Sequence, residues 1–577
     1  MIKNEMYKQW KKIKDLPESI KLDLNEMNKQ DDIIEDAFNG FLSFGTAGMR
    51  GLMGAGTNRI NIFTIRQATE GLSNYMDTLD EETKKRGVAI SFDSRYNSKE
   101  FAYEAARVLG HHNIPSYVFD GIRPTPELSF AVRHLNAFAG IMITASHNPK
   151  QYNGFKIYGE DGGQMPPKAS DMITSFVRKA SDLFAIQAMP IRDLRKNSLI
   201  KIIGEDVDEA YLKEAKSVNI NHTLIKKAGK NLKFVYTPLH GTGKVLARRA
   251  LQDAGFMNYS IVAEQTISDP EFPTVKFPNP EFPEAFNLSI KLGNKVSADI
   301  LIATDPDADR LGAAVRQPDG SYELMSGNQI AVVLMNYILK AKQDNDELPE
   351  NGVIVKSIVS TELASKIAES YDIKTINVLT GFKFIAEQIK HFESNHNHTF
   401  LFGFEESFGY LIKPFVRDKD AIQSTMLLAE VAAYYKEKGK TVYDGLQDIY
   451  KKYGFYEEKT ISKVFNGSDG KKQMTKIMEK LRNTNLDTFG NQKVVSTEDF
   501  QESVKTSQNG QQTKIDLPKS NVLKYWLSDG TWLAVRPSGT EPKIKFYVGT
   551  NASNKDTALE KLNNFEEYVH KLVEKLL

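Results

Sequence analysis

The sequence predicts an α/β protein built from several domains. Short apolar runs rich in β-branched residues alternate with longer amphipathic stretches, the pattern of domains with mixed or parallel sheets. The chain has 577 residues, which is too long for one hydrophobic core and suggests roughly three to five domains. No repeat with a fixed period of about 20 to 50 residues stands out, so we do not expect a solenoid.

Five of the apolar runs end directly in a polar loop. Residues 137–143 precede Ser146, 234–236 precede the loop 238–243, 300–302 precede Asp305, 400–402 precede Glu405, and 532–535 precede Arg536. Ligand sites of α/β sheets lie at such strand ends, so these loops are the expected site. Further along, residues 496–521 are rich in Gln, Ser, Lys and Thr and predict a solvated excursion, and 554–577 predict a closing amphipathic helix.

Composition excludes several classes of protein. The 75 Lys and Arg residues balance 74 Asp and Glu residues, and a net charge of +1 offers no global field for nucleic acid or an anionic membrane. No apolar stretch approaches the roughly 18 residues of a membrane helix, and the N-terminus lacks an apolar signal core. The absence of cysteine excludes disulfides, thiolate metal sites and cysteine nucleophiles and fits a cytoplasmic location.

The first chemical motif is Thr-Ala-Ser-His-Asn-Pro at 144–149, followed by Asn-Gly-Phe-Lys at 153–156. Its serine, Ser146, is the best candidate in the chain for a carrier of covalent phosphate. It lacks the Gly-x-Ser-x-Gly elbow of a serine hydrolase, which argues against that class. His147 is interpreted as orienting this loop, with a purely structural loop histidine as the alternative.

The second motif is Thr-Asp-Pro-Asp-Ala-Asp-Arg at 304–310, directly after an apolar run. In extended backbone, Asp305, Asp307 and Asp309 would share one face and repel one another unless a cation lay among them. A hard ion with oxygen ligands, above all Mg²⁺, meets that need. An EF-hand is excluded because arginine stands where it requires glycine and glutamate. A haloacid-dehalogenase-type phosphatase with Asp305 as nucleophile and a solvated acidic turn remain alternatives.

Two further loops carry groups suited to a phosphosugar. The first runs from Arg536 through Ser538 and Gly539 to Thr540 and combines an arginine fork, two hydroxyls and a glycine, which a phosphate dianion requires. The second, Gly-Phe-Glu-Glu-Ser-Phe-Gly at 403–409, offers Glu405 and Ser407 as acceptors for sugar hydroxyls. Taken alone, the first motif is also an ordinary turn and the second also a helix start or a solvated edge.

Together these stretches resemble the α-D-phosphohexomutase superfamily. The resemblance runs from Phe-Gly-Thr-Ala-Gly-Met-Arg-Gly at 44–51 to Arg-Pro-Ser-Gly-Thr at 536–540, nearly the whole chain, in the family's order. The sequence is most similar to the bacterial α-phosphoglucomutase subgroup. The animal phosphopentomutase and glucose-1,6-bisphosphate synthase branch shares the Gly-Thr-Ala-Gly start, Thr-Gly-Phe-Lys at 380–383 and the Glu-Glu-Ser-Phe-Gly loop.

The resemblance implies a heart-shaped architecture of four domains, three related α/β units and a smaller mobile C-terminal α+β domain. We place the domains at residues 1–200, 201–320, 321–445 and 446–577, carrying in turn the phosphoserine, metal, sugar and phosphate loops. It also implies that phosphate moves between C1 and C6 of a hexose through a bisphosphorylated intermediate, which turns end over end between two phosphate sites.

The resemblance also implies a role for each site residue. Ser146 would be the phosphoserine, and one Mg²⁺ would be held by Asp305, Asp307, Asp309 and the phosphoryl group on Ser146. Lys156 would accept the proton of the attacking hydroxyl, with a pKa tuned by desolvation and neighbouring cations. The remaining groups are charge donors and substrate ligands: Arg50 and Arg310 near the phosphoryl group, Lys383, Glu405, Ser407 and Lys419 on the sugar, and Arg536, Ser538, Gly539 and Thr540 on the unreacting phosphate.

The implied activity is interconversion of glucose 1-phosphate and glucose 6-phosphate, with glucose 1,6-bisphosphate as activator and intermediate. Gly-Phe-Lys around Lys383 resembles the glucose and pentose branches more than the mannose branch, whereas Ala421 stands where relatives often carry glycine. Phosphopentomutase, phosphomannomutase, bisphosphate synthase or Mg²⁺ phosphatase activity, or a non-catalytic sugar-phosphate-binding protein, are the alternatives. We expect small sugar phosphates as the only partners and a monomer or weak dimer.

Overall fold

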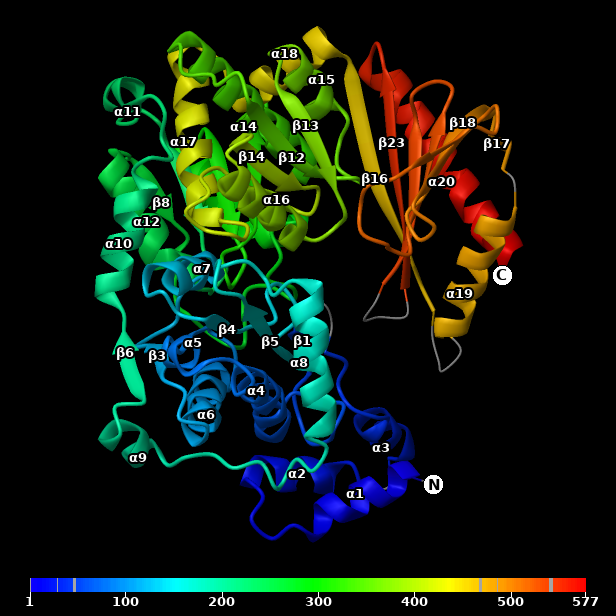
Figure 1. The fold of residues 1–577 in the computed structure, drawn as a ribbon. Coiled ribbons are helices and arrows are strands. Elements are labelled where there is room, and N and C mark those ends of the chain that lie inside the picture. The colour runs from blue at the N-terminus through cyan, green and yellow to red at the C-terminus, as the bar shows by residue number, and fades with distance from the viewer. Residues whose placement is uncertain (1, 29, 45–47, 466–469, 485, 539–542) are drawn as a thin grey trace. The chain divides into compact units, whose positions relative to one another are not determined.

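The computed structural model describes residues 2–28, 30–44, 48–465, 470–484, 486–538 and 543–577 (Figure 1). The chain forms two compact units. The first unit contains Met1–Ser326, Ala386–His396 and Ser407–Thr441, and the second contains Gly327–Ile385, Asn397–Glu406 and Val442–Leu577.

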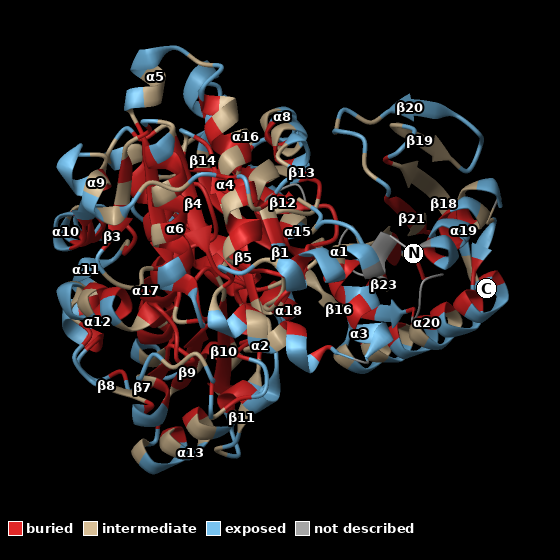
Figure 2. Ribbon diagram, turned by 90° about the horizontal axis from the view of Figure 1, so that it is seen from below, coloured by how far each residue is buried: buried red, intermediate tan, exposed pale blue. Residues whose placement is uncertain are grey.

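The first sheet of the first unit has six strands in the order β1-β5-β4-β2-β3-β6. Its strands are β1 (Gly48–Leu52), β5 (Tyr152–Tyr158), β4 (Ala139–Ile143), β2 (Val88–Phe92), β3 (Ser116–Phe119) and β6 (Ile200–Ile203). The last four are parallel, and β5 runs antiparallel to β4 and β1. Every residue of β2 and β4 is buried, which explains why these strands are continuous apolar runs. Figure 2 shows β4 in the buried interior, coloured red.

Helices pack around this sheet. They are α4 (Ile62–Met76), α6 (Ser98–His111), α7 (Thr125–His134) and α8 (Pro167–Lys179), with α5 (Glu81–Lys85) and α9 (Ile191–Lys196) at the periphery. The N-terminal helices α1 (Ile2–Lys12), α2 (Glu18–Glu26) and α3 (Asp31–Phe38) enclose a separate aromatic cluster. In it, Trp10 makes edge contacts with Phe38 and Phe63 at centroid distances of 5.7 and 5.4 Å.

The second sheet of the first unit has the order β11-β10-β9-β7-β8. The strands are β7 (Phe234–Thr237), β8 (Tyr259–Ile261), β9 (Ile300–Thr304), β10 (Leu311–Arg316) and β11 (Tyr322–Leu324), of which β7, β8 and β9 are parallel. Helices α10 (Glu205–Ala215), α11 (His222–Ala228), α12 (Gly243–Ala254), α13 (Asn287–Val296) and α17 (Ala421–Glu437) accompany it, with short turns of 3₁₀ helix at Ala263–Gln265 and Pro283–Phe286 and the short strand β15 (Gly409–Leu411). Helix α17 contacts β9, β10, α11 and α12 and is apolar on nearly all sides, as expected of a central helix.

The second unit contains parallel strands β12 (Gly352–Ser357), β13 (Lys374–Val378) and β14 (Thr399–Glu405). Helices α14 (Gly327–Asp344), α15 (Leu363–Glu369) and α18 (Val442–Tyr453) pack together beside them, and α16 (Phe382–Asn395) begins in this unit. Every residue of the central strand β12 is buried, as expected of an apolar strand whose two faces are both covered.

The C-terminal part of the second unit is an antiparallel sheet with the order β16-β23-β22-β21-β18-β19-β20. Its strands are β16 (Phe455–Val464), β23 (Lys543–Ala552), β22 (Trp532–Pro537), β21 (Leu523–Leu527), β18 (Gln492–Asp499), β19 (Val504–Ser507) and β20 (Gln512–Lys514), and β17 (Thr488–Phe489) pairs with β18. Helices α19 (Gly470–Asn483) and α20 (Lys555–Leu576) complete this α+β domain.

The predicted α/β class and the closing helix are confirmed. The expected excursion at 496–521 is solvent-accessible but not irregular, because β18, β19 and β20 pair there as the edge of the sheet. Among the described residues, no helix is long and apolar enough to cross a membrane. The three predicted boundaries between the four domains stay predictions.

Candidate active site

Ser146 lies in the loop between β4 and β5, at an end of the first sheet. Its backbone has a φ of 51°, in the left-handed region that residues other than glycine rarely adopt. The Ser146 amide donates to Thr144 Oγ1 at 2.8 Å, which anchors the turn. Ser146 is only 4% exposed, and its Oγ donates to Asp305 Oδ2 at 2.7 Å and lies 3.1 Å from His147 Nδ1.

The predicted metal loop follows β9 of the second sheet. Asp305, Asp307 and Asp309 are buried, and one oxygen of each lies within 4.8 Å of the others. The expectation that an extended backbone gathers them is wrong. A tight turn does so instead: Ala308 has a φ of 50°, and Asp305 Oδ1 accepts from the amides of Asp309 and Arg310 at 3.1 and 3.0 Å.

These three carboxylates fit a divalent cation. Asp307 Oδ1 and Asp309 Oδ1 are buried and have no hydrogen-bond partner within the described part of the chain. Burial, together with Asp307 and Asp309, raises the pKa of Asp305 well above its usual range. Three buried carboxylate oxygen donors with unused lone pairs are the set that a hard ion such as Mg²⁺ binds.

Two lysines neutralise part of this charge. Lys156, on β5, donates to Asp307 Oδ2 at 2.9 Å and lies 3.8 Å from Asp309 Oδ2. Lys419 lies 3.1 Å from Asp309 Oδ2 and donates to Asp418 Oδ1 at 2.9 Å. Burial would lower the pKa of Lys156, but Asp307 and Asp309 outweigh it and raise that pKa. The expected downward tuning of Lys156 is therefore wrong for this arrangement, in which the lysine is a cation.

Arginines lie on both sides of the Ser146 loop. Arg50, on β1, donates to Asn148 Oδ1 at 2.9 Å. Arg310 donates to Glu281 Oε1 at 2.7 Å and to the backbone oxygen of Ser407 at 3.1 Å. Burial and, secondarily, these two arginines lower the pKa of His147 well below its usual value, so the imidazole beside Ser146 is neutral.

Of the other predicted residues that the structure describes, Ser407 and Lys419 lie in the first unit, and the second unit holds Lys383, Glu405, Arg536 and Ser538. Glu405 ends β14 and its Oε1 accepts from the Gly381 amide at 2.6 Å, so this carboxylate fixes the residue just before α16, the helix that carries Lys383. Arg536 is in β22, and the Ser538 amide donates to the Lys543 carbonyl at 2.8 Å. Gly539 and Thr540 lie outside the described residues, as do Gly45, Thr46 and Ala47 of the N-terminal motif.

Three residues that support the site were not found by sequence reasoning. Thr125, at the start of α7, donates through its hydroxyl to Asp307 Oδ2 at 2.9 Å. Glu281 holds Arg310, and Asp418 accepts from Lys419, Tyr158 and Gln164. Asp418 is next to Lys419, a predicted sugar ligand, whereas isolated Thr125 and Glu281 carry no local pattern.

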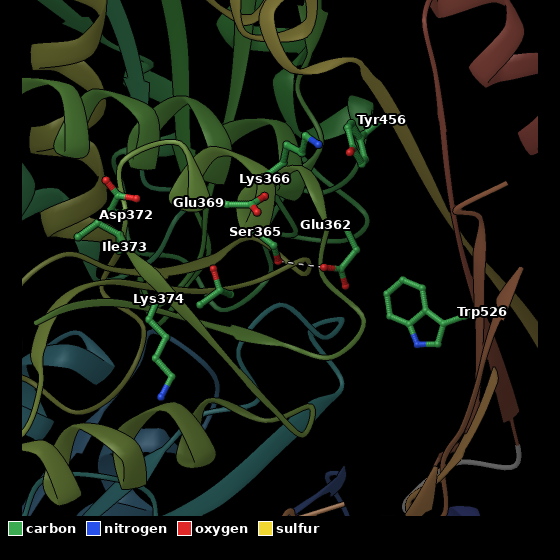
Figure 3. Close-up of a pocket in the computed structure, with 10 residues that line it drawn as sticks. Glu362, Ser365, Lys366, Glu369, Asp372, Ile373, Lys374, Tyr456 and Trp526 are labelled. Carbon is green, nitrogen blue, oxygen red and sulfur yellow. Dashed lines mark hydrogen bonds between the residues drawn. The ribbon is translucent and has the colours of Figure 1, made fainter. Parts of the chain in front are cut away.

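A cavity of about 600 Å³ lies elsewhere, within the second unit. Residues of α15 and β13 line it together with Tyr456 and Trp526, which face it from the C-terminal sheet (Figure 3). None of the predicted site residues lines this cavity. The predicted site around Ser146 is therefore separate from this cavity.

A buried serine hydroxyl bonded to one carboxylate of a metal-fitting trio, with lysines and arginines around it, defines a phosphoryl-transfer enzyme. Four family profiles match the chain. They describe the alpha/beta/alpha domains I, II and III and the C-terminal domain of phosphoglucomutase/phosphomannomutase, and they match residues 42–183, 209–320, 326–453 and 471–562.

Individual proteins of the same family are also similar to this chain. The phosphoglucomutases of Staphylococcus epidermidis and Staphylococcus aureus are each 41% identical, covering 92% and 93% of this chain and 94% of their own. The crystal structure of the Paramecium phosphoglucomutase parafusin is similar in fold, with a TM-score of 0.67 at 18% identity over 92% of this chain and 95% of that one. The chain belongs to the phosphoglucomutase/phosphomannomutase family, as the resemblance predicted, and is a mutase with the family's four domains.

Proposed function

We propose that the chain is an α-phosphoglucomutase that interconverts glucose 1-phosphate and glucose 6-phosphate through phosphorylated Ser146 and a glucose 1,6-bisphosphate intermediate. The observation that carries the proposal is the 2.7 Å hydrogen bond between Ser146 Oγ and Asp305 within the buried carboxylate trio. The choice of glucose is supported by the staphylococcal relatives, which are named phosphoglucomutases.

Asp305, Asp307 and Asp309 would hold one Mg²⁺ per chain together with the phosphoryl group on Ser146. When bound, this ion supplies charge neutralisation at the transferring phosphoryl group. Arg50 and Arg310 add positive charge from the protein, and His147 orients the serine loop. Lys156 and Lys419 lie against Asp307 and Asp309 and keep the trio partly neutral before substrate arrives.

In one half of the reaction a sugar hydroxyl attacks phosphorus, the bond between phosphorus and Ser146 Oγ breaks, and the hydroxyl proton ends on Ser146 Oγ. In the other half Ser146 Oγ attacks the phosphorus of a sugar phosphate, the bond from phosphorus to the sugar oxygen breaks, and the serine proton ends on that oxygen. We assign Lys383, Glu405, Ser407 and Lys419 to the sugar. Arg536, Ser538, Gly539 and Thr540 are assigned to the phosphate that does not react, because an arginine fork and hydroxyls suit a dianion. Glucose 1,6-bisphosphate would prime Ser146. We also propose a cytoplasmic monomer or weak dimer.

The test is turnover of the purified chain with Mg²⁺ and trace glucose 1,6-bisphosphate, comparing glucose 1-phosphate, mannose 1-phosphate and ribose 1-phosphate. We expect a clear preference for glucose 1-phosphate. Ser146→Ala should lose turnover by a factor of about 10⁴ or more because no covalent intermediate can form. Ser175→Ala, an exposed serine of α8, should match the wild type.

Preference for ribose 1-phosphate or mannose 1-phosphate would reassign the substrate while leaving the mechanism in place. Release of inorganic phosphate without isomerisation would contradict the proposed phosphoglucomutase activity. Full activity of Ser146→Ala would contradict the role of the serine.

A further inference from the structure

The loop that presents Ser146 is held in an unusual backbone conformation. Ser146 has a left-handed φ, and residues 144–151 belong to no helix or strand. Such a conformation persists only where surrounding groups fix it. The contacts that fix this loop therefore help to place Ser146 Oγ against Asp305.

One side chain, that of Arg95, makes most of the contacts that fix the loop. Arg95 follows β2, and its guanidinium donates to four backbone oxygens of the loop. The acceptors are the carbonyls of Ser146 and Asn148 at 2.5 Å each, Pro149 at 2.8 Å and Tyr152 at 3.1 Å. The four N–H groups of the two terminal nitrogens thus match four carbonyls, including that of the serine itself.

Arg95 is itself fixed on its other side. Its Nε lies 3.1 Å from Asp93 Oδ2, and both side chains are fully buried. The same Asp93 oxygen accepts from Thr144 Oγ1 at 2.6 Å, and Thr144 Oγ1 accepts from the Ser146 amide. A closed path of one ion pair and three hydrogen bonds therefore runs from Arg95 through Asp93 and Thr144 to Ser146 and back to Arg95. The ring of Phe272 packs over the guanidinium with its centroid 5.0 Å from Cζ.

We propose that Arg95 is a positioning residue for phosphoryl transfer at Ser146: it holds the serine loop so that Oγ keeps its reactive place beside Asp305. This inference rests on the proposed function, because it assigns Arg95 to that same site. Lysine cannot replace it, since a single ammonium cannot reach four carbonyls spread along the loop.

The variants separate positioning from folding. Arg95→Lys keeps the charge beside Asp93 but loses the fork. Arg95→Gln combined with Asp93→Asn removes both charges together and so avoids leaving one ion buried alone. The matched control is Arg86→Gln in the same domain. Arg86 also bonds backbone carbonyls, but those of Asn136 and Ala137, which precede β4, whereas the serine loop follows β4.

Two measurements are made on the full chain. Steady-state kinetics should show kcat lowered about 100-fold in the paired variant, with KM within about threefold of wild type, and an intermediate loss for Arg95→Lys. Hydrogen exchange should show faster exchange in the peptide spanning residues 144–152, with the rest of the domain unchanged. Arg86→Gln should match the wild type in both.

Unchanged exchange of this peptide in both Arg95 variants would overturn the inference, and so would kcat within threefold of wild type in both. An equal loss of protection across the whole domain would also overturn it, since Arg95 would then serve folding alone. The exchange measurement needs no turnover. If the wild type showed no mutase activity but the variants still exchanged faster, the proposed function would be refuted. The role of Arg95 in holding the loop would still be supported.

Discussion

Asp305 shows how one residue can serve two purposes in the site. Its Oδ1 accepts from the Asp309 and Arg310 amides and closes the turn, while Oδ2 accepts from Ser146. Closing the turn needs only an acceptor oxygen, whereas the hydrogen bond from Ser146 is strengthened by the negative charge of the carboxylate. Asparagine keeps the oxygen and removes the charge, so it separates the two.

We predict that Asp305→Asn lowers Mg²⁺ affinity at least about tenfold while leaving the metal-free fold intact. Without metal, the Tm should equal or exceed that of wild type because one charge of a mutually repelling buried trio is gone. Added Mg²⁺ should raise the Tm of wild type more than that of the variant. Titration calorimetry and melting curves with and without Mg²⁺ measure both effects.

Asp319→Asn is the control, because Asp319 is also a turn aspartate that bonds a following backbone amide, that of Ser321, yet belongs to no carboxylate cluster. An Asp305→Asn protein that binds Mg²⁺ as tightly as wild type would remove this residue from the metal site.

At the scale of elements, much of the site follows from where strands end. The apolar runs before Ser146 and Asp305 are β4 and β9, so the sequence pattern predicts two of the loops that meet. The turn at Ala308 could not be predicted, because the Asp305 side chain bonds the amides of Asp309 and Arg310 and so overrides the extended conformation expected there. Thr125 meets Asp307 across 182 positions, a pairing set by packing of α7 and not by local pattern.

Helix α4, which packs against α6 and α8 in the same domain, begins with a strong cap. The Asn61 side chain accepts from the amides of Phe63 and Thr64 and donates to the carbonyls of Gly54 and Gly56, and it is 2% exposed. Thr64 Oγ1 accepts from the Asn61 amide in return. This is a capping box with two additional bonds to a buried loop.

We predict that Asn61→Ala destabilises the first unit by about 2–3 kcal/mol, since it removes a cap and leaves buried carbonyls unpaired. Asn554→Ala, which removes the exposed cap of α20 at the Thr557 amide, should cost about 1 kcal/mol. Urea denaturation compares the two, and hydrogen exchange in the first turn of α4 should accelerate only in Asn61→Ala. Equal losses in the two variants would show that the extra bonds of Asn61 contribute nothing.

At the scale of the whole molecule, the nearly balanced total charge conceals local concentrations of charge in both units. The first unit holds the carboxylate trio with its lysines. The second holds a buried cluster in which Glu362 accepts from Lys356 at 3.2 Å and from Lys524 at 3.3 Å. Lys524 also donates to the Ile358 carbonyl at 2.7 Å, which ties β21 of the C-terminal sheet to the segment after β12. Glu362 also accepts from Ser365, the bond drawn in Figure 3.

This cluster predicts an acid-sensitive second unit. Burial would raise the pKa of Glu362, but Lys356 and Lys524 outweigh it and lower the pKa to about 2. Because the folded pKa lies below the unfolded value of about 4.3, Glu362 contributes stability that is present above that value. The contribution is lost as the pH falls from about 4.3 towards 2.

Lys524 has a separate effect on stability at high pH. Burial lowers its pKa to about 8 although Glu362 opposes the shift. The unfolded chain, with a lysine pKa of about 10.4, then binds more protons than the folded chain between these values. This lysine therefore adds stability as the pH rises from about 8 to 10.4.

We expect Glu362→Gln to destabilise the second unit by about 3 kcal/mol at pH 7, because two buried cations lose their shared partner. It should also flatten the decline of the urea midpoint between pH 4.5 and 2. Tryptophan fluorescence suits the measurement, since Lys524 Nζ lies 4.2 and 4.6 Å from the ring centroids of Trp526 and Trp532. Glu369→Gln is the control, because Glu369 is an exposed residue at the end of α15, the helix that Glu362 directly precedes. If Glu362→Gln and Glu369→Gln kept the same steep acid dependence as wild type, the cluster would not be what makes this unit sensitive to acid.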